Sequence, residues 1–554
     1  MISANLSPAP AGWVTKGLML LKSLGPYALV EFVLPGGTLI ALLLWLYRQH
    51  RHQQRSTARP TLTWRRTLIV GAAAAMTAGC TVGPDFVRPE PPAAAYSHSV
   101  PATGAAQSFA YGGAVAGDWY RLFRSDALDQ LVHAALAGNP DLQAARHGLA
   151  AAQEELKAVS GAALPQIDAA GQVGRAHING SQLLAPAAAL NATGNRYQIG
   201  PSLAYNLDPF GGVRRSIESQ QAQTAAVQDQ LRDTYVTLVD QVVVTAFDYA
   251  AVRAQIKVTR SLVSELQAQY DLTVQLEKAG KVIRSDTLQA QTQLENVRAT
   301  LPDLEQERDA YRNALARLSG QTPDEFKMPG LTLADFTLPG RLPLSVPSAL
   351  VRQRPDVLAA EESLHSASAE IGVAQAARLP QLSLSAQYAQ QTTRLSELFT
   401  QPGGIWSAGL GLAAPLFHGG TLAARSREAR QRYAQALSVY QGTVIGAFVE
   451  VADALQALQH DDASYSAHDR ALQAASANQD LAAAQYRAGK YTELQVLTAE
   501  QQYQSAALTQ VHADVQRFTD TAGLFRALGG GWWNSPDGAL LGAASIDDRS
   551  NSNH

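Results

Sequence analysis

The sequence predicts a mainly α-helical protein with a small β component, built as two structural repeats. Two long stretches, residues 213–279 and 421–488, carry a helical pattern with almost no interruption. Four shorter segments alternate apolar and polar residues, as strands with one apolar face do. The elements of the first half recur in the same order roughly 210 residues later. Together these observations predict an α+β fold with an internal duplication.

The composition excludes several classes of protein. Charged residues make up only 16% of the chain and the formal net charge is -3, so no basic excess points to a nucleic-acid partner. The single cysteine, Cys80, excludes a disulfide framework and a cysteine-rich metal site. Between residues 89 and 554, no run approaches the ~18 uninterrupted apolar residues of a membrane-spanning helix. This excludes a polytopic inner-membrane transporter.

Residues 61–79 have the pattern of a secretory signal that ends at Cys80. Arg65 and Arg66 precede a short apolar core, and small residues lead to the cysteine. The segment resembles a bacterial lipoprotein signal, which implies that Cys80 becomes the lipidated first residue of the mature chain. Thr81 follows it rather than an aspartate, which by the same resemblance favours the outer membrane.

Residues 1–60 precede this signal and leave two interpretations open. Residues 25–47 are apolar and are followed by the basic run RQHRHQQR, so they could form a first membrane segment with its positive flank inside. We favour the alternative that the true start of translation lies near Leu62 and that the extension reflects a mis-set start.

Five pairs of short motifs carry the duplication. They are Asn139-Pro140-Asp141 with Arg354-Pro355-Asp356, Ala163-Leu164-Pro165-Gln166-Ile167 with Arg378-Leu379-Pro380-Gln381-Leu382, Phe210-Gly211-Gly212 with Phe417-His418-Gly419-Gly420, Ala279-Gly280-Lys281 with Ala488-Gly489-Lys490, and Leu288-Gln289-Ala290 with Leu497-Thr498-Ala499. We therefore divide the chain as follows: a lipidated segment 80–124, repeat 1 at 125–322, a Pro- and Gly-rich connector 323–347, repeat 2 at 348–528, and a C-terminal tail 529–554.

Each repeat opens with a helix, 140–163 or 355–378, that begins with proline followed by aspartate, both favoured in a first helical turn. Two predicted strands follow, about 165–175 and 196–208 in repeat 1 and about 380–390 and 405–417 in repeat 2. Each long helix comes next; at ~1.5 Å per residue it would extend roughly 100 Å. Gly280 and Gly489 then mark turns into shorter helices, 285–318 and 494–528, so each repeat ends in a helical hairpin.

The strands predict a membrane barrel shared between several chains. Strands of about ten residues match the ~9–11 residues that cross a bilayer when tilted, but the smallest membrane barrels need about eight strands. An open sheet would leave unsatisfied edges in lipid. A homotrimer would supply twelve strands, and its helices would form a tube below them.

Several motifs together resemble the TolC-like outer membrane factors, in particular the lipoprotein branch (NodT or OprM type) of resistance-nodulation-division efflux systems. The resemblance covers residues 80–530. The motifs are CTVGPDFVRP at 80–89, Asp118-Trp119-Tyr120, Asn139-Pro140-Asp141, VPSALVRQRPD at 346–356 and Tyr486-Arg487-Ala488-Gly489.

This resemblance implies a TolC-like trimeric channel with a 12-stranded outer-membrane β-barrel, a periplasmic α-barrel and an equatorial belt. The function implied is that of a passive exit duct for drugs or small solutes in a tripartite efflux pump. The tips of the hairpins would meet a periplasmic membrane fusion protein and, through it, an inner-membrane efflux pump. The tip residues are Gly280, Lys281, Tyr486, Arg487, Gly489 and Lys490.

The same resemblance points to a pore constriction near the tip. Many relatives carry Asp-Val-Leu-Asp-Ala where this chain has QVLTA at 495–499, so both aspartates are missing. We expect the constriction to consist of Asp286, Gln289, Gln495 and Thr498, with only a weak preference for cations. The alternative is that these side chains pack between helices.

Other functions fit less well. The histidines show no metal-ligand spacing, and Gly280-Lys281 and Gly489-Lys490 lack the remainder of a phosphate-binding loop. We therefore expect no enzymatic activity, no metal and no cofactor other than the lipid on Cys80. A type I secretion conduit in the outer membrane remains an alternative. A periplasmic structural or adaptor protein is a further alternative, but the two predicted helical hairpins argue against it.

Overall fold

The computed structural model describes residues 81–90, 107–178, 192–345, 347–400 and 403–535. The chain divides into two units, Met1–Ala78 and Gly79–His554, and every described residue belongs to the second. The predictions for the extension 1–60, the signal 61–79 and Cys80 therefore lie outside the described residues, as does the tail beyond residue 535.

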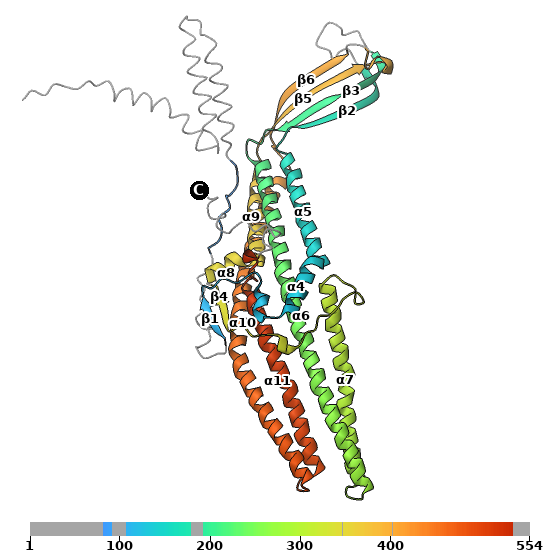
Figure 1. The fold of residues 1–554 in the computed structure, drawn as a ribbon. Coiled ribbons are helices and arrows are strands. Elements are labelled where there is room, and N and C mark those ends of the chain that lie inside the picture. The colour runs from blue at the N-terminus through green and yellow to red at the C-terminus, as the bar shows by residue number, and fades with distance from the viewer. Residues whose placement is uncertain (1–80, 91–106, 179–191, 346, 401–402, 536–554) are drawn as a thin grey trace, which may run out of the picture. The chain divides into compact units, whose positions relative to one another are not determined.

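Both repeats contain the same elements in the same order (Figure 1). Repeat 1 runs through α4 (Asp126–Gly138), α5 (Pro140–Gly161), β2 (Gln166–Ile178), β3 (Ala192–Asn206), α6 (Gly212–Lys278) and α7 (Arg284–Leu318). Repeat 2 runs through α8 (Pro347–Gln353), α9 (Pro355–Ala376), β5 (Gln381–Thr392), β6 (Gly404–Ala413), α10 (Thr421–Arg487) and α11 (Glu493–Ala527). α6 and α10 each have 67 residues, and α7 and α11 each have 35. These equal lengths confirm the predicted duplication.

The duplication extends to single hydrogen bonds. Asn139, just before α5, donates from its side-chain amide to the carbonyl of Leu318 at 2.9 Å. Arg354 stands just before α9 and donates to the carbonyl of Ala527 at 3.0 Å. Leu318 and Ala527 are the last residues of α7 and α11. Asn139 and Arg354 thus fasten the end of the last helix of each repeat, α7 or α11, to the start of α5 or α9, at the same place in both repeats.

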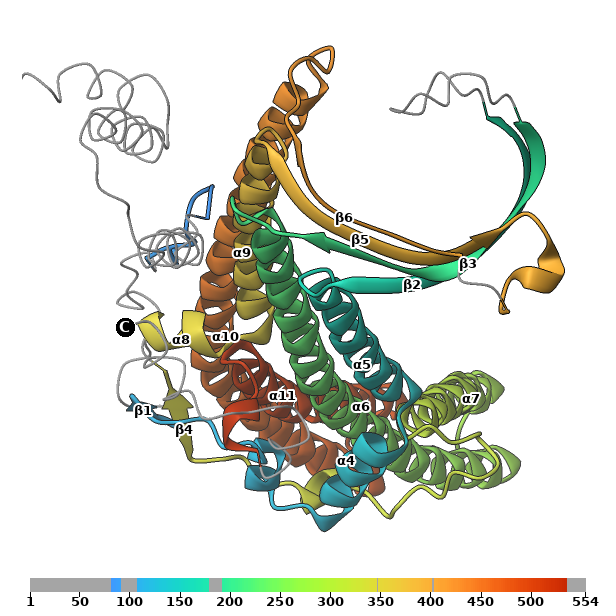
Figure 2. The same cartoon turned by 90° about the horizontal axis from the view of Figure 1, so that it is seen from above.

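The four predicted strands form one antiparallel sheet in the order β2-β3-β5-β6, which curves strongly (Figure 2). Tyr388 lies opposite Trp406 and Leu384 opposite Leu410, so these apolar side chains share one face. Trp406 is 79% exposed. Serines and glutamines of the same strands, such as Ser385 and Gln387, point to the other face. An exposed apolar face opposite a polar one is the pattern of a transmembrane β-barrel.

The sheet lies at one end of the long helices, and the turns between α6 and α7 and between α10 and α11 lie at the other end (Figure 1). α6 packs against α5, α7, α9 and α11. Among the described residues, α6 is the helix long and apolar enough to cross a membrane, but most of its apolar stretch is buried within the protein. Burial of this kind identifies α6 as a core helix.

Midway along the helices, a layer of short elements surrounds an aromatic core. It contains β1 (Ser108–Tyr111), which pairs in parallel with β4 (Arg341–Leu344), and three short turns: η1 (Trp119–Phe123), η3 (Leu333–Asp335) and η5 (Trp532–Asn534). The ring centroid of Phe247 on α6 lies 5.0 Å from that of Phe123 and 4.8 Å from that of Phe336. The two-stranded sheet was not predicted from the sequence.

The segment 81–90 is fastened to the helices just below the sheet. Val82 donates its backbone N–H to the carbonyl of Phe210 at 3.1 Å. Asp85 pairs with Arg215 of α6 at 2.5 Å, and the ring of Phe86 stacks on His365 of α9 at 4.4 Å. A Cβ on Gly211 would lie 2.4 Å from the Thr81 methyl group, so the chain passes directly over this turn.

Candidate functional site

The two predicted tips have the same backbone geometry. Gly280 has φ +68° and Gly489 has φ +69°, in the left-handed region that glycine tolerates best. Lys281 donates its N–H to the carbonyl of Leu276, and Lys490 donates to the carbonyl of Gln485, each at 2.9 Å. These bonds close a Schellman turn at the end of each long helix. The prediction that Gly280 and Gly489 end the long helices is therefore confirmed.

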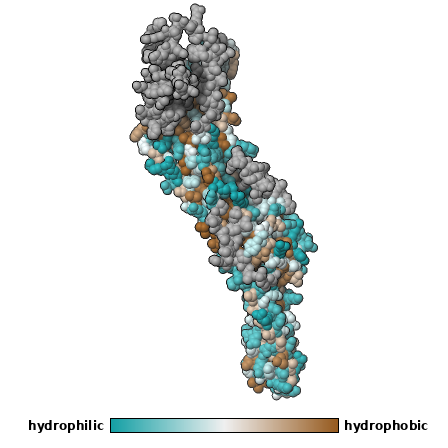
Figure 3. Space-filling view, turned by 90° about the vertical axis from the view of Figure 1, so that its left-hand side faces the viewer, coloured by the Kyte–Doolittle hydropathy of each residue, from teal (hydrophilic) through white to brown (hydrophobic). Residues whose placement is uncertain are grey.

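Most of the predicted tip residues face solvent. Gly280, Lys281, Arg487, Gly489 and Lys490 are exposed. The face of the hairpins seen in Figure 3 is mostly hydrophilic toward the tips. The three cations among these residues, Lys281, Arg487 and Lys490, are therefore accessible at the surface.

Tyr486 differs from the other tip residues because it is half-buried and bonded. Its hydroxyl donates to Glu493 Oε2 at 2.6 Å. Glu493 Oε1 accepts from the Thr273 hydroxyl and from the Gln269 amide, each at 3.0 Å. Burial and this carboxylate raise the pKa of Tyr486. The Glu493 side chain thus fastens the second hairpin to α6 of the first.

Sequence reasoning missed Glu493. It is 6% exposed, although a glutamate in the first turn of a helix normally faces solvent and complements the helix dipole. The only signal available was its position three residues after the tip residue Lys490. Its partners on α6 are distant in the chain and could not be identified from spacing.

The structure brings together two of the four predicted constriction residues. Gln289 on α7 and Thr498 on α11 line one groove of about 400 Å³ between the hairpins, together with Leu288 and Leu494. Asp286 is half-buried in the first turn of α7 and does not line this groove. Gln495 is exposed, and its Oε1 accepts from the backbone N–H of Thr492 at 2.8 Å. Gln495 therefore caps the N-terminus of α11 in a capping box.

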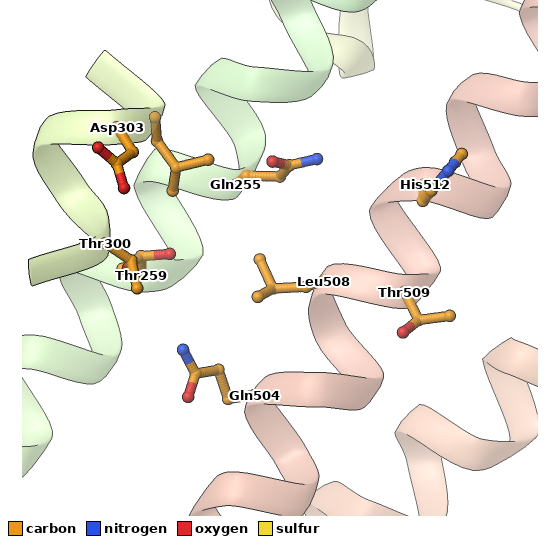
Figure 4. A pocket seen from close by; sticks show the side chains of 9 residues that line it. Gln255, Thr259, Thr300, Asp303, Gln504, Leu508, Thr509 and His512 are labelled. Carbon is orange, nitrogen blue, oxygen red and sulfur yellow. The ribbon is translucent and has the colours of Figure 1, made fainter. Parts of the chain in front are cut away.

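A second groove, of about 440 Å³, lies between α6, α7 and α11, further from the hairpin tips than the first (Figure 4). Thr259 and Thr300 lie on one side of it, and Gln504 and Leu508 on the other. Two amides, three hydroxyls, the leucines Leu304 and Leu508, Asp303 and His512 give it a mixed lining without a charge cluster. Within the described part of the chain, no group of three or more metal-ligating side chains comes together.

Glu500 lies further along α11, only 8% exposed. Its Oε2 has no hydrogen-bond partner. Burial, reinforced by the negative charges of Glu265 and Glu493, raises the pKa of Glu500 to about 7. The carboxyl group is therefore protonated in the folded protein over a range of pH in which it would be ionised in the unfolded chain.

This shift predicts a stability that falls as pH rises. Below about pH 4.5, Glu500 is neutral in both the folded and the unfolded state. Between about pH 4.5 and about pH 7, only the folded state holds the proton. The free energy of unfolding therefore falls by up to roughly 3 kcal/mol as the pH rises through this range. Glu500→Gln should therefore raise the melting temperature at pH 8 and leave it unchanged at pH 4. The measurement is thermal unfolding followed by circular dichroism. Glu295→Gln, on the exposed face of α7, is the control; an equal gain in both variants would contradict the assignment.

Comparisons of the sequence and of the structure with known proteins point to the same family. The family model for outer membrane efflux proteins matches residues 131–321 and 346–530. The toluene efflux pump outer membrane protein TtgC of Pseudomonas putida is 30% identical over 476 residues, covering 84% of this chain and 96% of TtgC. The pyoverdine export outer membrane protein OpmQ of P. putida is 28% identical, covering 75% of this chain and 88% of OpmQ. The solved structure of the outer-membrane channel OprN superimposes with a TM-score of 0.71 at 30% identity, covering 82% of this chain and all of that chain.

Proposed function

The chain belongs to the outer membrane efflux protein family, and we propose that it is the outer-membrane channel of a tripartite efflux pump, a passive exit duct for drugs or small solutes. One observation carries this function. A four-stranded sheet with an exposed apolar face stands on two long helical hairpins whose tips are polar. The sheet suits the outer membrane, and the hairpins suit the periplasm. A duct needs no catalytic group, so we propose no enzymatic activity.

The active form in this proposal is a homotrimer. The described strands leave β2 and β6 as edges of the sheet, and lipid does not tolerate an open edge. Three copies close a barrel of twelve strands within the range known for such proteins. The exposed cations at the tips would contact a periplasmic fusion protein, which links the channel to an inner-membrane pump. The lipoprotein signal favours efflux over a type I secretion conduit.

The duct should conduct ions through a constriction formed by Asp286, Gln289, Gln495 and Thr498. The groove that Gln289 and Thr498 share supports this location. Planar-bilayer recording of the purified protein should show channels with weak cation preference. Asp286→Ala should reduce that preference, because it removes the one carboxylate of the set. Thr498→Asp should increase it and introduce block by multivalent cations, because a trimer would then carry a ring of carboxylates.

Two results would contradict this assignment at different levels. Folded protein that never conducts would overturn the proposed duct. Channels whose selectivity is the same in wild type, Asp286→Ala and Thr498→Asp would leave the duct intact but place the constriction elsewhere along the tunnel.

We also propose that Cys80 carries a lipid anchor. Thr81, the next residue, lies at Gly211 in the turn between β3 and α6. A lipid attached one residue earlier would therefore start beside the periplasmic end of the sheet, where an acyl chain can enter the adjacent leaflet. Radiolabelled palmitate should enter the wild type and not Cys80→Ser. Equal labelling of the two would show that the lipid is attached elsewhere.

A further inference from the structure

The segment 81–90, which we call the strap, crosses the seam between α6 and α9. We propose that the protonated side chain of His365 holds the strap on this seam, and that the strap is released when this side chain loses its proton. The proposal goes beyond the function as a duct, because it concerns a conformational switch near the N-terminus that does not depend on conduction. It applies whether or not Cys80 carries a lipid.

The strap is bound to both helices of the seam. The Asp85 carboxylate pairs with Arg215 of α6 at 2.5 Å, and Arg88 pairs with Glu361 of α9. Arg215 also donates from Nε to the backbone carbonyl of Val82 at 3.3 Å. Because the two ion pairs reach opposite sides of the seam, the strap can make both only while α6 and α9 keep their present separation.

The fit between the strap and α9 leaves little room for adjustment. A Cβ built on Gly83 would lie 2.5 Å from the Cα atom of Gly372 on α9. A Cβ built on Gly372 would lie 2.7 Å from the carbonyl oxygen of Val82. Backbone therefore lies directly on backbone, and packing this close transmits small shifts rather than absorbing them. A change in the seam should consequently disturb the strap.

His365 lies at the centre of this site and joins its three parts. The ring stacks on that of Phe86 in the strap, with centroids 4.4 Å apart and planes inclined by 13°. Nε2 lies 3.1 Å from Glu218 Oε1 on α6, and Nδ1 lies 3.5 Å from Glu362 Oε2 on α9. Only a protonated ring has an N–H on both nitrogens. A charged His365 therefore binds both helices and also attracts the face of the Phe86 ring.

The surrounding charges favour the protonated ring. The titratable groups of the site come from the strap, α6, α9 and α10, and they are Asp85, Arg88, Arg215, Glu218, Glu361, Glu362 and Tyr440. The bond to Glu362, supported by Glu218, raises the pKa of His365 above its ordinary value of 6.5, although burial opposes the shift. Burial and Glu361 raise the pKa of Tyr440. Histidine is the side chain whose ordinary pKa lies nearest neutrality, so His365 is the group expected to titrate there.

The sign of the switch follows from the raised pKa. At acidic pH His365 is charged and its contribution to docking is complete; this contribution is lost as the pH rises through the raised pKa. A neutral ring can donate to Glu218 or to Glu362, but not to both, and it no longer attracts Phe86 as a cation. The strap should therefore leave the seam as the pH rises. Its ten residues span on the order of 30 Å when extended, so release would lengthen the N-terminal tether.

Hydrogen–deuterium exchange of the full-length protein in detergent tests this switch. The reporter is a peptide that contains Val82, whose N–H is bonded to the Phe210 carbonyl. After correction for the intrinsic effect of pH on exchange, its protection should be at least several-fold higher at pH 6 than at pH 8.5. His365→Gln should give low protection at both values. Glu362→Gln should keep the transition but move its midpoint to lower pH, because the largest cause of the raised pKa is removed.

His133 provides a matched control, because it is an exposed histidine of α4 that lies 3.4 Å from a carboxylate oxygen of Asp129. His133→Gln should leave both the protection of the strap and its pH dependence unchanged. Equal protection of the wild type at the two pH values would overturn the switch, and so would a pH dependence that persists in His365→Gln. Loss of protection throughout α6 and α9 together with the strap would also overturn it, because the whole seam would then unfold instead of releasing the strap.

Discussion

Replacing Arg232 by methionine should lower the free energy of unfolding by about 3–5 kcal/mol, because it leaves a buried carboxylate without its cation. Asp229 is 0% exposed and Arg232 is 1% exposed on α6. The guanidinium lies 2.5 Å from Asp229 and 4.2 Å above the ring of Trp532. Trp532 in turn donates from Nε1 to the carbonyl of Gln353 at 2.8 Å. The Arg232 side chain therefore fastens the turn η5, which contains Trp532, to the core helix α6.

A matched pair on the surface isolates the effect of burial. Arg298 and Glu295 have the same spacing on α7 and lie 2.7 Å apart, but their side chains are 44% and 53% exposed. Arg298→Met should cost less than about 1 kcal/mol. Joint replacement of Arg232 by methionine and Asp229 by leucine should recover part of the loss, because the buried carboxylate is removed together with its cation. Urea unfolding followed by circular dichroism measures all of these variants. Equal losses for Arg232→Met and Arg298→Met would contradict the argument.

The long helices could be predicted because local sequence determines them. Residues 213–279 contain neither proline nor glycine, and α6 spans Gly212–Lys278. The glycines at 280 and 489 supply the left-handed residue that ends each helix. The strands were also located, but β2 and β3 run closer to their connecting loop than the predicted ranges 165–175 and 196–208. Alternation marks the centre of a strand better than its end, because pairing with a neighbour determines where it stops.

Features that depend on contacts distant in the chain could not be predicted. In the sequence, Asp229 and Arg232 look like an ordinary exposed pair, but in the fold both are buried and the Trp532 ring lies over the Arg232 guanidinium. Glu493 acquires its partners only when α6 lies beside the second hairpin. The pairing of β1 with β4 joins segments more than 200 residues apart through four residues each. The constriction residues remain a prediction for a related reason, since a pore lining is defined by three chains and one chain shows only the groove at Gln289 and Thr498.

Gly320→Ala should be strongly destabilising, by about 3–5 kcal/mol, because two costs coincide. Gly320 follows α7 with φ +69°, where a side chain adds about 1–2 kcal/mol of strain. A Cβ there would also lie 1.9 Å from the carbonyl oxygen of Gly138. That atom belongs to the backbone of the last residue of α4, so it cannot move aside as a flexible side chain would. Relieving the overlap would separate α7 from Asn139, whose amide is bonded to Leu318.

Gly280→Ala separates these two costs, because Gly280 has nearly the same φ, +68°, and the same place in a Schellman turn. No atom lies within 4 Å of a Cβ built on it. Only the backbone strain should remain, about 1–2 kcal/mol, so the difference between the two variants measures the close approach of α7 to the α4–α5 junction. Urea unfolding of both variants gives this difference directly. If they lose equal stability, the contact at Gly138 relaxes freely and the strain alone accounts for both glycines.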